Sequence, residues 1–296
     1  MSGAAEAWGL LLVLLAGFAA GGINAVAGGG TILTFAVLSA ILPPGPGRLV
    51  AANVTSKIGL WPGAAAAAWA YRGSRESQPT WARWLVLPSS VGAVLGVALL
   101  RVLPKESFDA VVPWLILLAA VLFAVQPQLG RFARWVSRGG GDDSSSAGRE
   151  AGFAAPAADP SDADRSGLPA GRFAVVFALQ LLVGVYGGYF GAGIGILMLG
   201  TLAVLGLGDV HALNASKNLL AAAVNGVSTV VLVAVALAGG FDVSWLHVAV
   251  LAVGSIAGGL VVSHLAQRLP ASVVRRLVAA IAFGLAGYHF WREWLG

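Results

Sequence analysis

The sequence lacks cysteine and contains little charge. Only 10% of its 296 residues are Asp, Glu, Lys or Arg, whereas an ordinary soluble domain carries about 25%. The absence of cysteine excludes a disulfide-stapled secreted domain and a thiol nucleophile. A disordered chain combines high charge with low hydrophobicity, so the scarcity of charge excludes it. An ordinary cytosolic enzyme needs a polar surface, which this composition does not provide.

Hydrophobic residues, by contrast, are abundant. They make up 58% of the chain, and the mean hydropathy is +0.84. A helix that crosses a bilayer needs about 20 mostly apolar residues. Apolar stretches of this kind occupy residues 8–42, 47–71, 84–102, 107–126, 173–207, 212–239, 244–266 and 271–291. We therefore predict an all-α polytopic membrane protein embedded in a lipid bilayer.

The 18 basic residues exceed the 13 acidic ones, which gives a formal net charge of +5. They are scattered along a hydrophobic chain and form no phosphate-binding stripe, so no nucleic-acid partner is expected. Residues 1–7 contain no Lys or Arg. Because a cleaved signal peptide begins with basic residues, we expect the first apolar segment to be retained.

The stretch at 128–170 differs from the rest of the chain. It contains three consecutive glycines at 139–141, three consecutive serines at 144–146 and six of the 13 acidic residues. Such a composition is typical of a flexible linker. The sequence therefore predicts a first membrane repeat at 1–127, a polar flexible linker at 128–170 and a second membrane repeat at 171–296.

The two membrane parts match each other at four places in the same order. Each part is expected to hold about four hydrophobic segments. The matches are AGGGTIL at 27–33 with AGIGILM at 192–198, SK at 56–57 with SK at 216–217, VGAVLG at 91–96 with VGSIAG at 253–258, and LP at 103–104 with LP at 269–270. Their offsets lie between 160 and 166 residues, which indicates a duplicated unit.

The segments at 8–42 and 173–207 are too long for one simple crossing. About 35 residues of helix would extend roughly 50 Å, against a hydrocarbon core of ~30 Å. Either each is one tilted, broken span, or each enters the membrane and returns as a re-entrant pair. Cytoplasmic loops are enriched in Lys and Arg. With eight simple spans the loop residues divide 10 to 6, whereas with two re-entrant segments they divide 12 to 4.

We therefore favour the re-entrant arrangement, in which Arg48, Arg101, Lys105 and Arg292 lie on the side with fewer basic residues. This arrangement leaves three full spans in each half. An odd number of spans makes the two halves inverted repeats, which is a common plan among secondary transporters.

Glycine clusters interrupt both long segments near their middle. Unpaired backbone groups are costly in hydrocarbon, so such a break needs a reason. A break exposes N–H groups at the start of the next helix, and these bind anions. The alternative is close helix packing, which we favour for Gly92, Gly96, Gly254 and Gly258. The candidate substrate-binding residues at the breaks are Asn24, Gly28, Gly29, Gly30, Thr31, Gly191, Gly193 and Gly195.

A lysine opens one apolar helix in each half. Lys57 and Lys217 occupy matching positions in the two repeats. A lysine that faces lipid is expensive, so each is expected to face a cavity, a partner or the interface; the alternative is that its stem extends to the headgroups. The candidate substrate-binding residues around them are Asn53, Thr55, Ser56 and Lys57 in the first half and Asn214, Ser216, Lys217 and Asn218 in the second.

Catalytic chemistry finds no support. No Asp or Glu lies clearly inside a predicted span, and His211, His247, His264 and His289 lack the spacing of metal ligands. We therefore expect no catalytic residue, no metal and no cofactor, and the chain is not expected to be an enzyme. A carboxylate relay for protons is not visible, which leaves proton coupling open.

Three segments give the chain a resemblance to a known family. They read GINAVAGGGT at 22–31, NVTSK at 53–57 followed by WPG at 61–63, and GYFGAGIG at 188–195. With one glycine-rich break and one Ser-Lys helix start in each half, the sequence resembles the TauE/SafE sulfite exporter family over its whole length. The resemblance implies a multi-pass transporter of the bacterial inner membrane that exports sulfite or a small sulfonate such as sulfoacetate.

The leading hypothesis is a secondary transporter for a small oxyanion. Alternating access would occur around a central site between the two repeats, where backbone N–H groups and hydroxyls bind the oxygens and the two lysines set the charge preference. A passive anion channel and a non-transporting membrane scaffold are the alternatives. The sequence leaves open which anion is carried, the coupling ion and the oligomeric state.

Overall fold

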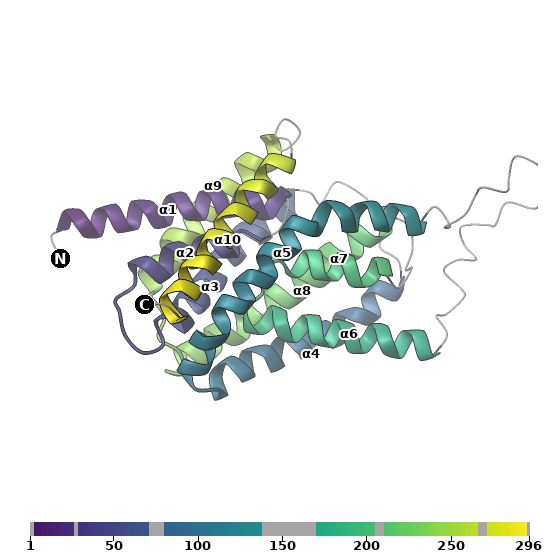
Figure 1. Ribbon diagram of the computed structural model, residues 1–296, viewed down its shortest axis with the longest axis horizontal. Helices are drawn as coiled ribbons and strands as arrows, with labels where there is room; N and C mark the ends of the chain where they lie inside the picture. Colours follow the sequence, from purple (N-terminus) through teal and green to yellow (C-terminus); the bar gives the residue numbers. More distant parts are fainter. Residues whose placement is uncertain are drawn as a thin grey trace, which may run out of the picture.

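The computed structural model describes residues 3–26, 29–70, 80–137, 170–204, 210–265 and 271–294. These residues form helices connected by turns, and no strand occurs among them, so the predicted all-α class is confirmed (Figure 1). The helices are α1 (Gly3–Val26), α2 (Thr31–Ile41), α3 (Arg48–Ala70), α4 (Thr80–Val102), α5 (Lys105–Ser137), α6 (Ala170–Tyr189), α7 (Ile194–Val204), α8 (Val210–Leu237), α9 (Trp245–Leu265) and α10 (Ala271–Trp294).

Four helices contain a stretch that is long and apolar enough to cross a membrane. These stretches are Ala4–Asn24, Trp81–Val102, Lys105–Gln128 and Ser216–Leu237. Large apolar side chains lie exposed on the outer faces of the bundle, such as Leu87 at 63% and Val230 at 67%. A water-soluble monomer rarely exposes apolar surface on this scale, so these faces suit contact with lipid. The chain is a multi-pass membrane protein.

Both long glycine-interrupted segments fold back on themselves. A Cβ added at Gly9, near the start of α1, would lie 3.5 Å from Cγ2 of Ile41 at the end of α2. In the second half, Nε2 of Gln180 in α6 donates to Oγ1 of Thr201 in α7 at 3.3 Å. A tilted, broken span would leave its two helices end to end. Both segments therefore form the hairpin that the re-entrant interpretation requires, while their placement in the membrane stays a prediction. Within the described residues, each half contains five helices rather than the four segments expected.

Glycines allow α4 to pack on α6 and α9 to pack on α1. A Cβ at Gly92 or Gly96 would clash with backbone oxygens of α6, and one at Gly254 or Gly258 would clash with backbone oxygens of α1. The helix backbones can approach this closely because these residues have no side chain. The packing role favoured for the four glycines from the sequence is thus confirmed.

The helix pairs correspond when the five helices of the two halves are matched in order. The contact of α1 with α9 corresponds to that of α6 with α4, and the contact of α3 with α9 to that of α8 with α4. Each half therefore packs one of its helices against the opposite half. Figure 1 shows α5 running diagonally beside α10, with which it is in contact. The correspondence of these contacts supports the prediction that the two halves are copies of one unit.

Basic residues that the re-entrant arrangement assigns to one side of the membrane lie at one end of the molecule. Nζ of Lys105 lies 3.1 Å from Oδ2 of Asp242, which precedes α9. A Cβ at Gly47 would clash with the Lys105 stem, and one at Gly240 would lie 2.9 Å from Nε of Arg101. The loops before α3, α5 and α9 therefore share one end, as the re-entrant interpretation expects for Arg48, Arg101 and Lys105.

The expected linker is only partly within the described residues. Helix α5 continues to Ser137, past the boundary expected at 127, and α6 begins at Ala170. Residues 138–169 lie outside the described residues. The division into repeat, flexible linker and repeat stays a prediction for that stretch.

Candidate functional site

The two glycine breaks meet on one aromatic side chain of α5. Gly29 has φ +114° and Gly193 has φ +74°. A residue with a side chain would be strained at these positive φ angles, which glycine adopts readily. A Cβ at Gly29 would clash with the ring of Phe123, and one at Gly193 would lie 3.7 Å from Cε2 of the same ring. Phe35 of α2 also packs edge-on against Phe190 at 5.6 Å between centroids. The structure thus brings together breaks that are more than 160 residues apart.

The first break is closed by its own asparagine. Oδ1 of Asn24 accepts hydrogen bonds from the N–H groups of Gly29 and Gly30, both at 2.8 Å. This is the arrangement of a helix N-cap, in which a side-chain oxygen satisfies N–H groups that have no partner within the helix. The sequence interpretation expected these N–H groups to be exposed to an anion; in this structure Asn24 takes them.

The second break has no such side chain. The N–H of Gly191 donates to the carbonyl of Tyr186 at 3.0 Å, and the Tyr186 hydroxyl donates to the carbonyl of Ala192 at 2.5 Å. The N–H groups of Gly193 and Gly195 donate no hydrogen bond to any other described residue. The N-terminus of α7 therefore presents uncapped N–H donors, as the anion-site hypothesis requires.

Lys217 lies beside this uncapped helix start. A Cβ at Gly195 would lie 3.7 Å from Cδ of Lys217, so the lysine stem crosses the first turn of α7. The Lys217 side chain is half-buried and that of Ser216 is buried, whereas Asn218 is exposed. Lys217 and the second break thus come together, and Asn218 lies away from them on the outer face of α8. The Asn214 side chain and Gly28 lie outside the described residues.

Lys57 has different surroundings. Its ammonium donates to the carbonyls of Gly187 and Gly188 at 2.7 and 2.6 Å, and only 7% of the residue is exposed. These carbonyls belong to the last turn of α6, which carries partial negative charge. Lys57 therefore binds the helix end that precedes the second break, across the boundary between the two halves.

The other polar residues of α3 pair with neighbouring elements. Nδ2 of Asn53 donates to the carbonyl of Tyr189 at 2.9 Å, while its Oδ1 is buried without a hydrogen-bond partner in the described chain. The Ser56 hydroxyl lies 2.6 Å from the hydroxyl of Thr34. Oγ1 of Thr55 accepts from the N–H of Ser244 at 3.3 Å. Asn53 and Lys57 thus contact the second break, and Ser56 contacts α2.

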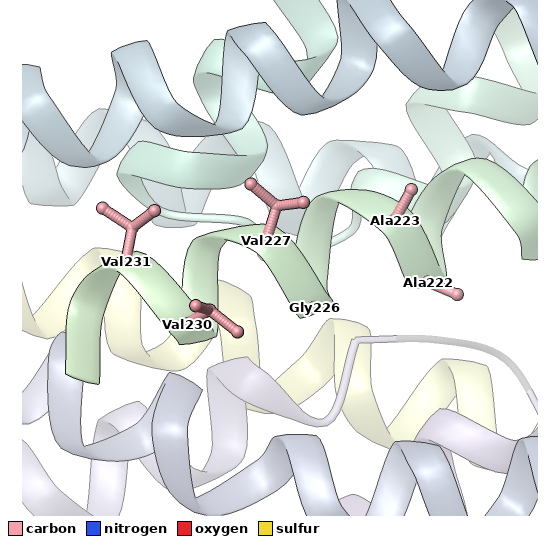
Figure 2. A pocket seen from close by; sticks show the side chains of 6 residues that line it. All are labelled: Ala222, Ala223, Gly226, Val227, Val230 and Val231. Carbon is pink, nitrogen blue, oxygen red and sulfur yellow. The ribbon is translucent and has the colours of Figure 1, made fainter. Parts of the chain in front are cut away.

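A cavity of about 380 Å³ opens on α8 (Figure 2). Apolar residues of this one helix line it, from Ala222 to Val231, and none of the candidate substrate-binding residues takes part. It offers an anion no polar partner. The described polar residues at the breaks do not line this cavity.

Residues that the sequence interpretation missed complete the site. Phe123 joins the two breaks, and Thr34 connects α2 to Ser56. Gln180 is fully buried in α6, where its amide contacts Thr201 of α7 and, at 3.4 Å, Ser89 of α4. A glutamine inside an apolar segment calls for a polar partner by the same argument as a lysine, so Gln180 could have been found. Phe123 carries no such signal.

Comparisons with known proteins agree on one family. The model of the family described as "Sulfite exporter TauE/SafE" matches residues 13–289. The chain is also 29% identical over 299 residues to a "Probable membrane transporter protein ORF9" from Sinorhizobium sp, with 97% of each chain covered. No solved structure matches.

Proposed function

The chain belongs to the TauE/SafE sulfite exporter family, and we propose that it exports a small oxyanion across the bacterial inner membrane by alternating access. The substrate that we favour is sulfite or an organosulfonate such as sulfoacetate. The family and the related protein are membrane transporters, not enzymes. The chain is accordingly a membrane transporter. The nature of the anion and the mechanism are the parts proposed here.

One observation carries the proposal: the second glycine break presents uncapped N–H groups at the start of α7 beside a lysine. The N–H groups of Gly193 and Gly195 have no partner among the described residues, and the Lys217 stem crosses the same turn. A helix N-terminus and a nearby ammonium favour an anion by two independent electrostatic effects. We assign the first contact with substrate to Gly193, Gly195 and Lys217.

The first break supplies the other side of the proposed site. Gly29 and Gly193 both contact Phe123, so a substrate at the second break would lie near the first. Asn24 holds the N–H groups of Gly29 and Gly30 in this structure. In the alternative conformation, Asn24 would turn away and these N–H groups, with Thr31, would bind the anion. Transfer of the anion from one break to the other is one way in which the site could open to alternate sides of the membrane.

Uptake into proteoliposomes tests the proposal. The panel consists of sulfite, sulfate, thiosulfate, sulfoacetate and taurine, each with and without a pH gradient. We expect sulfite or sulfoacetate to be transported selectively and to accumulate against its own gradient when an ion gradient is imposed. Selective flux that never exceeds electrochemical equilibrium under any imposed gradient would identify a channel instead.

The scaffold alternative places the function in the linker. Deletion of residues 139–165, which lie outside the described residues, separates the two possibilities. We expect the deletion variant to retain transport in the same proteoliposome assay, because the proposed site lies entirely in the helices. Loss of transport in a folded deletion variant would contradict this expectation.

A further inference from the structure

The C-terminal end of α6 receives three hydrogen bonds from α3. The carbonyls of Gly187 and Gly188 accept from the Lys57 ammonium, and the carbonyl of Tyr189 accepts from the Asn53 amide. The last carbonyls of any helix have no partner within that helix. In this protein the opposite half of the chain supplies those partners at three successive residues.

The charge of Lys57 is balanced by this helix end. Among the described residues, the Lys57 ammonium donates to two carbonyl oxygens and pairs with no carboxylate. The negative end of the α6 dipole and two carbonyl oxygens are the groups that compensate the buried ammonium. A buried charge without such compensation would be strongly destabilising.

A spare oxygen lies on the same face of α3. Asn53 is one helical turn before Lys57, so the two side chains share a face. Oδ1 of Asn53 is buried and has no hydrogen-bond partner in the described part of the chain. The Asn53 amide nitrogen donates to Tyr189, so this oxygen lies near the same helix end, but it accepts no hydrogen bond from the Lys57 ammonium. Neutral oxygens at the end of a broken helix are the ligands that hold Na⁺ in many transporters.

We infer that the C-terminal end of α6 is a monovalent-cation site and that the Lys57 ammonium fills it permanently as a tethered cation. Its ligands are the carbonyls of Gly187 and Gly188, with Asn53 beside them. Lys57 is then a positioning residue that holds the second break in place, and it does not touch the substrate. Two of its three N–H donors are already bound to α6.

A consequence for coupling rests on the proposed transport function. A cation that is part of the chain cannot be exchanged with the medium, so this site gives no dependence on Na⁺ or K⁺. Replacing sodium in the medium by potassium or choline should therefore leave the occupancy of this site unchanged. The cation site itself can be tested without any transport measurement, so its failure can be told apart from failure of the proposed function.

The test is thermal unfolding of the purified full-length protein in chloride salts of equal ionic strength. The cations are Na⁺, K⁺, methylammonium and choline, the last being too large for the site. The unmodified protein should give one Tm in all four salts. Lys57→Ala, which vacates the site, should have a lower Tm in choline and recover about 3–6 °C in at least one of the smaller cations.

Four further variants make the outcome specific. Lys57→Met is used in the same way if Lys57→Ala does not accumulate, because it keeps the apolar stem. Lys57→Gln retains a hydrogen-bond donor without charge and should remain cation-dependent, whereas Lys57→Arg should not. Lys217→Ala is the matched control at the equivalent position, and its Tm should not respond to the choice of cation.

Three results would overturn the inference. The first is a Tm of the unmodified protein that rises in Na⁺ or K⁺ relative to choline, since a filled site cannot bind them. The second is a folded Lys57→Ala or Lys57→Met variant with the same Tm in all four salts. Full recovery of stability by Lys57→Gln in choline would also reject it, because a hydrogen bond alone would then explain the role of Lys57.

Discussion

The two glycine breaks come from matching parts of the sequence, but their ends are closed in different ways. At the first break, Asn24 of the same hairpin takes the N–H groups of Gly29 and Gly30. At the second break, the N–H groups at the start of α7 are uncapped among the described residues, and Lys57 of the other half takes the carbonyls at the end of α6. The two breaks are therefore closed asymmetrically although their sequences match.

The matching lysines differ in the same way. Lys57 is bound to the negative end of α6, whereas Lys217 lies along the positive end of α7. A positive charge is stabilised at a helix C-terminus and is unfavourable at an N-terminus unless an anion is present. Under the proposed function, Lys57 acts on the structure and Lys217 acts on the substrate. Four predictions, taken from the largest expected effect to the smallest, test this comparison.

Substitution of Gly29 and of Gly193, the two glycines that face the Phe123 ring, should have the largest and most unequal effects on folding and transport. Gly29→Ala combines φ +114° with a clash against the Phe123 ring, whereas Gly193→Ala has φ +74° and finds that ring at 3.7 Å. We expect Gly29→Ala to abolish folding or transport, and Gly193→Ala to cost about 1–2 kcal/mol for the left-handed conformation. Membrane accumulation, Tm and sulfite uptake measure this. Equal damage from both would contradict the asymmetry.

Lys217→Ala should weaken substrate binding without a large loss of stability. Removal of an ammonium beside the α7 N-terminus should raise the KM for the transported anion about 10-fold, which corresponds to about 1.4 kcal/mol. Concentration-dependent uptake measures KM, and Tm reports stability. Lys217→Arg, which keeps the charge, is the matched control and should retain most of the affinity. If KM is unchanged in Lys217→Ala, the substrate does not bind at this lysine.

Asn24→Ala should convert the first break toward the state of the second. Loss of the side-chain oxygen leaves the N–H groups of Gly29 and Gly30 without an acceptor, which costs about 0.5–2 kcal/mol as for other helix N-caps. Tm should therefore fall. Sulfite should restore part of it, because an anion can replace the missing oxygen. Asn24→Ser is the control that keeps an acceptor. A Tm of Asn24→Ala that does not respond to sulfite would show that the first break does not receive the substrate.

The sequence was sufficient to predict the features that depend on neighbouring residues. The length of residues 8–42 and 173–207 left a broken span or a re-entrant hairpin, and the distribution of Lys and Arg favoured the hairpin. The spacing of Gly92 with Gly96 and of Gly254 with Gly258 predicted close packing. These succeed because the length of an apolar stretch and a four-residue glycine spacing act within one or two helices. The family could also be identified, since its motifs recur in both halves.

The asymmetry of the site could not be predicted in this way. Both helix starts read Ser-Lys, yet the carbonyl partners of Lys57 lie 130 and 131 residues further along the chain. Such contacts are set by the packing of α3 against the opposite half, which no local pattern encodes. One difference was visible in the sequence: at the offset that aligns the two breaks, Tyr189 stands where the first break has Asn24.

The smallest effect should come from a contact between the halves that lies outside the breaks. Lys105 and Asp242 form an exposed pair at 3.1 Å, with side-chain exposures of 50% and 83%. Solvent screens such pairs, and they contribute about 0–1 kcal/mol. Lys105→Ala should therefore change Tm by no more than about 3 °C and leave KM unchanged. If the loss were as large as for Lys57→Ala, any ionic contact between the halves would matter equally, and the special role of the α6 carbonyls would have to be abandoned.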